Sequence, residues 1–129
     1  MPDFTVPKYS EKIREIIKLL TSAESDYKWH YDQVNILDKQ TQDLLHSLEL
    51  DDLAYSGRCK VATKIRKVRR ERREHKDIVE ATAPIVDFLE SEKGKQIYNL
   101  LREVQGKSKK VEAYHANRVY IPRVQEDKP

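Results

Sequence analysis

Residues 9–48 read YSEKIREIIKLLTSAESDYKWHYDQVNILDKQTQDLLHSL, and this stretch decides the fold. Within it, a series of mostly apolar side chains recurs at alternating spacings of three and four residues. This spacing places the series along one face of a long α-helix. We predict a helix over residues 10–48, with Ser10 as its N-cap because a serine hydroxyl is a good acceptor at that position. The positions on the predicted seam are Ile13, Ile16, Leu20, Ala23, Tyr27, His30, Val34, Leu37, Thr41, Leu44 and Leu48.

Residues 54–89 read AYSGRCKVATKIRKVRRERREHKDIVEATAPIVDFL and repeat the same spacing. Folding the chain at the acidic joint of residues 49–52 brings the two seams face to face, for instance with Leu37 opposite Ile65. This arrangement is an antiparallel hairpin of two long helices, packed like a coiled coil. The positions on the second seam are Ala54, Arg58, Val61, Ile65, Val68, Arg72, His75, Val79, Thr82, Val86 and Leu89.

The second predicted helix covers residues 53–91 and is kinked near Pro84, because a proline inside a helix removes a backbone hydrogen bond. A third, shorter helix is predicted over residues 95–115 and docks near the open end of the hairpin. We expect residues 1–9 to form an irregular arm and residues 117–129 an extended tail, so that the whole chain is a single all-α domain. The third helix is expected to pack through an apolar face that consists of Ile97, Leu100, Leu101, Val104 and Val111.

Composition agrees with long, solvated helices. Of the 129 residues, 36% are charged and 38% apolar, with only three glycines, which suits helices better than a sheet with many turns. No apolar run approaches the roughly 18 residues of a membrane-spanning helix, and the N-terminus lacks the basic and apolar regions of a signal peptide. Cys59 is the single cysteine, which rules out an intramolecular disulfide framework. We therefore expect a cytoplasmic protein.

The net charge is only +3, but it is distributed unevenly. Residues 1–52 carry a balance of −5, residues 53–80 one of +6 and residues 81–129 one of +2. The most basic segment is KVATKIRKVRRERREHK, residues 60–76. Part of this charge is expected to pair with the acidic first helix and to fix the antiparallel register. The predicted pairs are Arg58 with Asp43, Lys64 with Asp38, Arg69 with Asp32 and Lys76 with Asp26.

Other basic side chains of the second helix face outward in this arrangement and form a basic strip. Arginine binds phosphate oxygens well, so the strip is a candidate nucleic-acid-binding surface, helped by lysines of the third helix. No helix-turn-helix, zinc finger or RNA-binding sheet accompanies it, so the binding would not depend on base sequence. The alternative is that the strip contacts a protein partner, and the tail would then contact the same partner. The residues concerned are Lys60, Arg66, Lys67, Arg70 and Arg73 of the strip, Lys107, Lys109 and Lys110 of the third helix, and Val119, Tyr120 and Ile121 of the tail.

Midway along the predicted seam the side chains become polar, and we call Tyr27, His30, Arg72 and His75 the polar waist. The predicted register places Arg72 opposite His30 and His75 opposite Tyr27. One interpretation is a site that binds an anion or responds to pH. The other, which we favour, is a register lock, in which buried polar residues exclude alternative alignments at a cost in stability.

The sequence shows no constellation for catalysis or for cofactor binding. The four histidines and Cys59 have no short metal-ligand spacing. Cys59 lies between Arg58 and Lys60, but no base is predicted beside it. There is neither a glycine-rich phosphate loop nor a paired-carboxylate cleft. We therefore predict a non-enzymatic protein without catalytic residues, bound metal, cofactor or small-molecule substrate.

Three segments resemble small helical proteins encoded by phages and prophages of Gram-positive bacteria: DKQTQDLLHSLEL (38–50), KVRRERREHKD (67–77) and NRVYIPRV (117–124). The resemblance implies a setting rather than a mechanism, in which a small protein binds a host or phage protein or assists DNA transactions. Our first hypothesis is a non-enzymatic helical interaction module with a protein partner, with self-association, or with both. The alternative is an accessory protein that binds nucleic acid independently of sequence through the basic face of the second helix.

Overall fold

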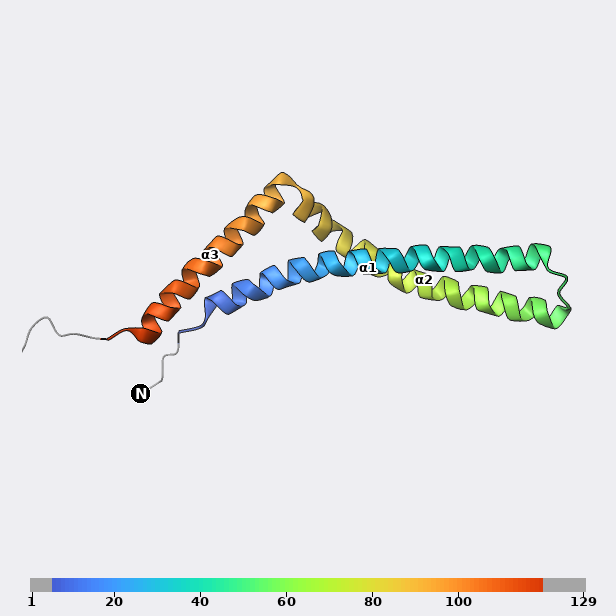
Figure 1. The fold of residues 1–129 in the computed structure, drawn as a ribbon, viewed down its shortest axis with the longest axis horizontal. Coiled ribbons are helices and arrows are strands. Elements are labelled where there is room, and N and C mark those ends of the chain that lie inside the picture. Colours follow the sequence, from blue (N-terminus) through green and yellow to red (C-terminus); the bar gives the residue numbers. More distant parts are fainter. Residues whose placement is uncertain (1–5, 120–129) are drawn as a thin grey trace, which may run out of the picture.

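The computed structural model describes residues 6–119, and that part of the chain consists of three α-helices. They are α1 (Tyr9–Leu50), α2 (Tyr55–Glu90) and α3 (Glu92–Asn117). α1 and α2 form an antiparallel hairpin whose closed end projects as a two-helix arm (Figure 1). The predicted all-α fold, with a long hairpin and a shorter third helix, is confirmed. Each predicted helix end lies within three residues of the observed one.

The predictions for the two ends of the chain fall mostly outside this range. α3 includes Asn117, so the helix continues past the predicted end at His115. The predicted tail residues Tyr120 and Ile121 lie outside the described residues, as does most of the predicted N-terminal arm. Val119 is described and is 79% exposed.

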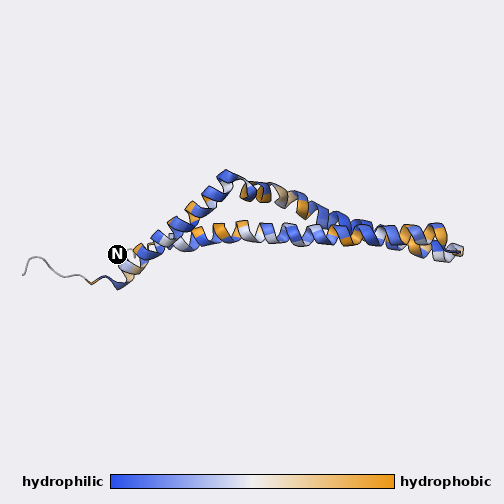
Figure 2. Ribbon diagram, turned by 45° about the horizontal axis from the view of Figure 1, so that its top comes forward, coloured by the Kyte–Doolittle hydropathy of each residue, from blue (hydrophilic) through white to orange (hydrophobic). Residues whose placement is uncertain are grey.

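The core is the seam between α1 and α2, and it is thin. Three residues predicted on the seam are exposed instead: Ile16, Ala54 and Arg58. The less exposed neighbour is Ile17 in the first case and Gly57 in the last. Figure 2 shows hydrophobic residues spread along all three helices rather than gathered in one globular centre. Six side chains are buried in the seam, all at predicted positions: Ala23, Val34, Leu37 and Thr41 of α1, and Val79 and Val86 of α2.

The register of the hairpin differs from the predicted one by about one layer of the seam. His30 faces His75 instead of Arg72, with 2.7 Å between the two Nδ1 atoms. Arg72 donates through Nε to Asp38 of α1, and this contact is the one ion pair between helices among residues 6–119. A slip of three residues is close to one helical turn, so both seams still face each other. Four predicted ion pairs are wrong: Arg58–Asp43, Lys64–Asp38, Arg69–Asp32 and Lys76–Asp26.

Ser91 alone connects α2 to α3, at the apex in Figure 1. It ends α2, since its backbone N–H donates to the Asp87 carbonyl oxygen at 3.1 Å, and it caps α3, since its hydroxyl accepts from the Gly94 N–H at 2.9 Å. Gly94 therefore belongs to the first turn of α3, one residue before the predicted start of this helix at Lys95. α2 runs through Pro84 without interruption, and its yellow C-terminal part, which holds Pro84, turns away from α1 (Figure 1).

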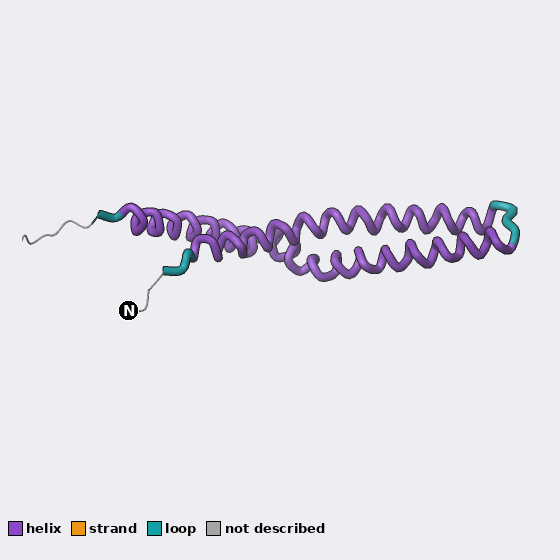
Figure 3. The backbone as a smooth tube through the Cα atoms, turned by 90° about the horizontal axis from the view of Figure 1, so that it is seen from below, coloured by secondary structure: helices purple, strands orange, loops and turns teal. Residues whose placement is uncertain are grey.

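α3 runs back from this apex toward the beginning of α1. As a result, the first half of α1, the end of α2 and α3 form the three sides of a triangle (Figure 1). A view turned by 90° shows the two helices of the arm side by side, with α3 beyond the other end of the arm (Figure 3). None of the described helices is both long enough and apolar enough to cross a membrane.

Candidate functional site

α3 turns a largely polar face toward the rest of the molecule. The shielded positions of this face recur every three or four residues, as one side of a helix requires. Only one of them, Leu101, is a large aliphatic residue. The prediction that α3 packs through its apolar face is therefore wrong for Ile97, Leu100, Val104 and Val111. The shielded positions are Gly94, Tyr98, Leu101, Gln105, Ser108 and Glu112.

The apolar side chains of α3 lie together on a neighbouring flank, which we call the apolar stripe. With 3.6 residues per turn, the stripe is displaced by roughly a quarter turn from the shielded face. About half of each side chain is accessible, and the side chains share one flank of the helix, so the stripe is a candidate contact surface. The stripe consists of Ile97 (44% exposed), Leu100 (57%), Val104 (47%), Val111 (53%) and Tyr114 (64%).

Glu112 fastens the end of α3 to the beginning of α1. Its carboxylate accepts a hydrogen bond from the Ser10 hydroxyl and another from the Ser10 backbone N–H, the latter at 3.1 Å. The prediction that Ser10 is the N-cap of α1 is therefore wrong, since the observed N-cap is Lys8. The backbone N–H of Ser10, in the first turn of α1, is instead satisfied by a side chain of α3. The hydroxyl and then the backbone bond lower the pKa of Glu112, with smaller contributions from Lys8 and Lys109. This contact holds the polar face of α3 against α1.

The basic strip of α2 lies on the arm. All five of its predicted members are exposed, and none forms an ion pair with another helix within residues 6–119. A shallow depression of about 520 Å³ on this surface is lined by side chains of both signs of charge, because Glu71 and Glu74 lie among the basic residues. The strip residues that line it are Arg66, Lys67 and Arg70, whereas Lys60 and Arg73 lie outside it.

The lysines of α3 do not extend this strip. Lys107, Lys109 and Lys110 are exposed near the end of α3, at the opposite end of the molecule from the tip of the arm (Figure 1). Lys107 pairs with Glu103 one turn earlier, at 3.2 Å. Lys109 lies beside Glu112 and lines a depression of about 360 Å³ between α1 and α3. The basic strip and these three lysines therefore lie on separate parts of the molecule (Figure 1).

The polar waist is only partly brought together. The two half-buried histidines face each other, so one Nδ1 must donate and the other accept the hydrogen bond between His30 and His75. Trp29, which is 55% exposed, packs edge-on against both rings, with centroid distances of 4.8 and 5.6 Å. Tyr27 stacks on Tyr31 at 5.9 Å, and Arg72 is held by Asp38.

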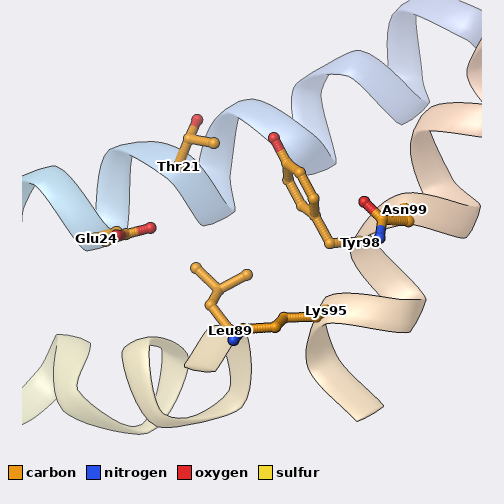
Figure 4. A pocket seen from close by; sticks show the side chains of 6 residues that line it. All are labelled: Thr21, Glu24, Leu89, Lys95, Tyr98 and Asn99. Atoms are coloured by element: carbon orange, nitrogen blue, oxygen red, sulfur yellow. The ribbon is translucent and has the colours of Figure 1, made fainter. Parts of the chain in front are cut away.

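A cleft of about 400 Å³ lies inside the triangle of helices, below the junction of α2 and α3. Figure 4 shows Tyr98 reaching across it from α3 toward α1 and Leu89 of α2 at its floor. The other lining residues are Thr21, Glu24, Lys95 and Asn99. This set contains neither a cysteine nor a histidine.

Metal-ligating side chains do not cluster in the part of the chain that the structure describes. No three residues of the types His, Cys, Asp and Glu are grouped there in a way that would hold a metal ion. Cys59 is exposed on α2 near the tip of the arm. The apolar stripe of α3 and the basic strip of α2 are the candidate binding surfaces.

Sequence reasoning missed Glu112 and Tyr114, and it paired Asp38 with Lys64 instead of Arg72. No local signal identifies Glu112 as a contact residue, because its partner Ser10 lies 102 residues away in the chain. Tyr114 does have a signal, since it follows Val111 by three residues and so continues the apolar spacing of α3.

Comparison of the chain with protein-family models, with curated proteins and with solved structures finds no match.

Proposed function

We propose that this chain is a non-enzymatic helical interaction module that binds another protein through exposed faces of its helices. The observation that carries the proposal is the apolar stripe of α3, whose five side chains stay 44% to 64% exposed while α3 packs through a polar face. Burying such side chains on a partner gains about 25 cal/mol per Å² of apolar surface. Isoleucine, leucine and valine on one face of a helix fit an apolar groove or another helix.

The setting that we propose is the cytoplasm of a bacterial cell, with a phage or host protein as the partner. Its support is the resemblance of three segments of the chain to small helical proteins of phages and prophages. The slender shape of the hairpin supports this proposal, because it offers long helix faces to a partner (Figure 1). An assembly role in which these faces hold a partner fits such a shape.

Site-specific photo-crosslinking tests the proposal. A photoreactive amino acid replaces Leu100 on the stripe in one variant and Arg102, which is exposed elsewhere on α3, in a matched control. Both variants are expressed in a Gram-positive bacterium and irradiated, and the adducts are identified by mass spectrometry. We expect a defined adduct from position 100 and none from position 102. Absence of any adduct from position 100 would contradict an interaction through the stripe.

The second candidate function is sequence-independent binding of nucleic acid through the basic strip. The observation that favours it is the exposure of the strip, whose charges make no ion pair with α1. Anisotropy of labelled DNA and RNA, measured at about 50 and about 200 mM salt, tests it, because phosphate contacts weaken steeply with salt. This function requires tight binding at the lower salt concentration that is lost when Arg66, Arg70 and Arg73 are all replaced by alanine. No binding at low salt would exclude it.

A further inference from the structure

We infer that the apolar stripe of α3 pairs with the same stripe of a second copy of this chain, in antiparallel orientation. The inference rests on the proposed function and names the partner for one of its surfaces. A second copy is favoured over an unrelated helix because the charged side chains along the stripe would complement those of an identical helix.

The stripe has the spacing of a coiled-coil seam. Ile97, Val104 and Val111 follow one another at strict intervals of seven residues, which makes them a positions of a heptad. The d positions, three residues after each, are Leu100, Lys107 and Tyr114. Five of these six side chains are apolar or aromatic and are exposed, so a second helix with the same repeat would complete the seam.

Lys107 is the one charged side chain in the seam, and it selects the orientation. In a parallel pair it would face Lys107 of the second copy, which places two like charges against each other. In an antiparallel pair, a positions face d positions, so Lys107 faces Val104 across the interface. Its amino group can then reach past the valine to solvent, as long basic side chains do at helix interfaces.

Charges beside the seam agree with the antiparallel orientation. Glu103 and Lys110 occupy the g positions, which lie opposite each other when two such helices are antiparallel. Two-fold symmetry forms the Glu103–Lys110 contact twice. In a parallel pair Glu103 would instead lie near Ser108, which carries no charge. The stripe is therefore complementary to itself in one orientation only.

The size of the seam sets the expected affinity. From Ile97 to Tyr114 it is about 26 Å long at 1.5 Å per residue. An interface of this length lies at the small end of the range for specific protein complexes, where transient contacts are found, so we expect weak and reversible self-association. The rest of the molecule does not block it, because the stripe lies on a flank of α3 and not against α1.

Sedimentation velocity over a range of concentrations tests the inference on the full chain. We expect the mass to rise from the 15.2 kDa of one chain toward twice that value. Val104→Glu puts a carboxylate into the centre of the seam and should weaken the association at least tenfold. Ile36→Glu is the matched control, since Ile36 is 47% exposed like Val104 but lies on the arm, and it should leave the association unchanged. A chain that stays monomeric at all concentrations, or two variants that weaken association equally, would overturn the inference.

Cysteine crosslinking determines the orientation. In a Cys59→Ser background, the antiparallel seam places position 100 of one copy opposite position 111 of the other. A mixture of Leu100→Cys and Val111→Cys chains should form a disulfide-linked dimer under mild oxidation, whereas neither variant alone should do so. A dimer formed by Leu100→Cys alone would show a parallel pair and refute the antiparallel one.

The two proposals fail separately. A monomeric chain whose position 100 crosslinks to a different protein in cells would overturn the homodimer and retain the interaction module. A dimer in solution without any other adduct in cells would retain the homodimer and refute the phage or host partner.

Discussion

Gly94 and Gly106 both lie in α3, yet an added methyl group would meet different surroundings at each. A Cβ atom at Gly94 would lie 1.6 Å from the carbonyl oxygen of Phe88, at the tight junction with α2. At Gly106 it would find no atom within 4 Å apart from the neighbouring backbone of its own helix. Neither glycine has a positive φ, so the difference comes from space and not from backbone conformation.

Alanine at these two positions should therefore have opposite effects on stability. Gly94→Ala should lower the free energy of unfolding by about 1 to 3 kcal/mol, as overpacking of a close contact does. Gly106→Ala should raise it by about 1 kcal/mol, because alanine is the better helix former. Urea unfolding followed by circular dichroism measures both. A stabilising Gly94→Ala would mean that the junction is looser than described.

Glu112 makes the contact between α1 and α3 dependent on pH. Its pKa is lowered in the folded chain by the hydroxyl and backbone N–H of Ser10. A depressed carboxyl pKa contributes stability above the unfolded value of about 4.3, and that contribution is lost as the pH falls through the folded value. A carboxyl ¹³C NMR titration should give Glu112 a midpoint below the ordinary glutamate range, and Ser10→Ala should raise it. A midpoint that Ser10→Ala leaves unchanged would disprove the assigned cause.

At the scale of the helices, heptad spacing predicts which residues form the seam but not how the two seams align. All six side chains buried between α1 and α2 are predicted positions. A slip of one layer keeps those same positions inward, so the apolar pattern hardly distinguishes the two alignments. The polar waist distinguishes them, because the observed register pairs His30 with His75 and lets Arg72 reach Asp38. The interpretation of the waist as a register lock stays a prediction.

A double-mutant cycle on the two histidines tests that interpretation. His30→Leu or His75→Leu alone leaves one half-buried ring without its partner and should cost about 1 kcal/mol of stability. Replacing both should be close to neutral, because two leucines fill the same layer and no polar group is left unpaired. Thermal and urea unfolding of the four proteins provide the coupling energy. If the two single effects simply add up in the double variant, the histidine contact does not contribute to stability.

At the scale of the whole molecule, the sequence predicts the hairpin and the third helix but not the face with which α3 docks. Apolar residues on α3 suggest packing onto the hairpin, and in the structure they stay outside. The reason lies in contacts that are distant in sequence. Glu112 bonds to Ser10, and the close approach at Gly94 fixes how α3 leaves α2, so both ends of α3 are constrained to present the polar side.

Methyl NMR with a soluble paramagnetic chelate tests most directly the claim that α3 packs through its polar face and leaves its apolar stripe free for a partner. The spectra are recorded on the dilute chain, below the concentration at which it self-associates. The methyl signals of Ile97, Leu100 and Val111 should broaden strongly, and that of Leu101 only weakly. The opposite result, with the stripe protected and Leu101 accessible, would show that α3 buries its apolar face against α1. That outcome would contradict both the docking of α3 and the surface on which the proposed function depends.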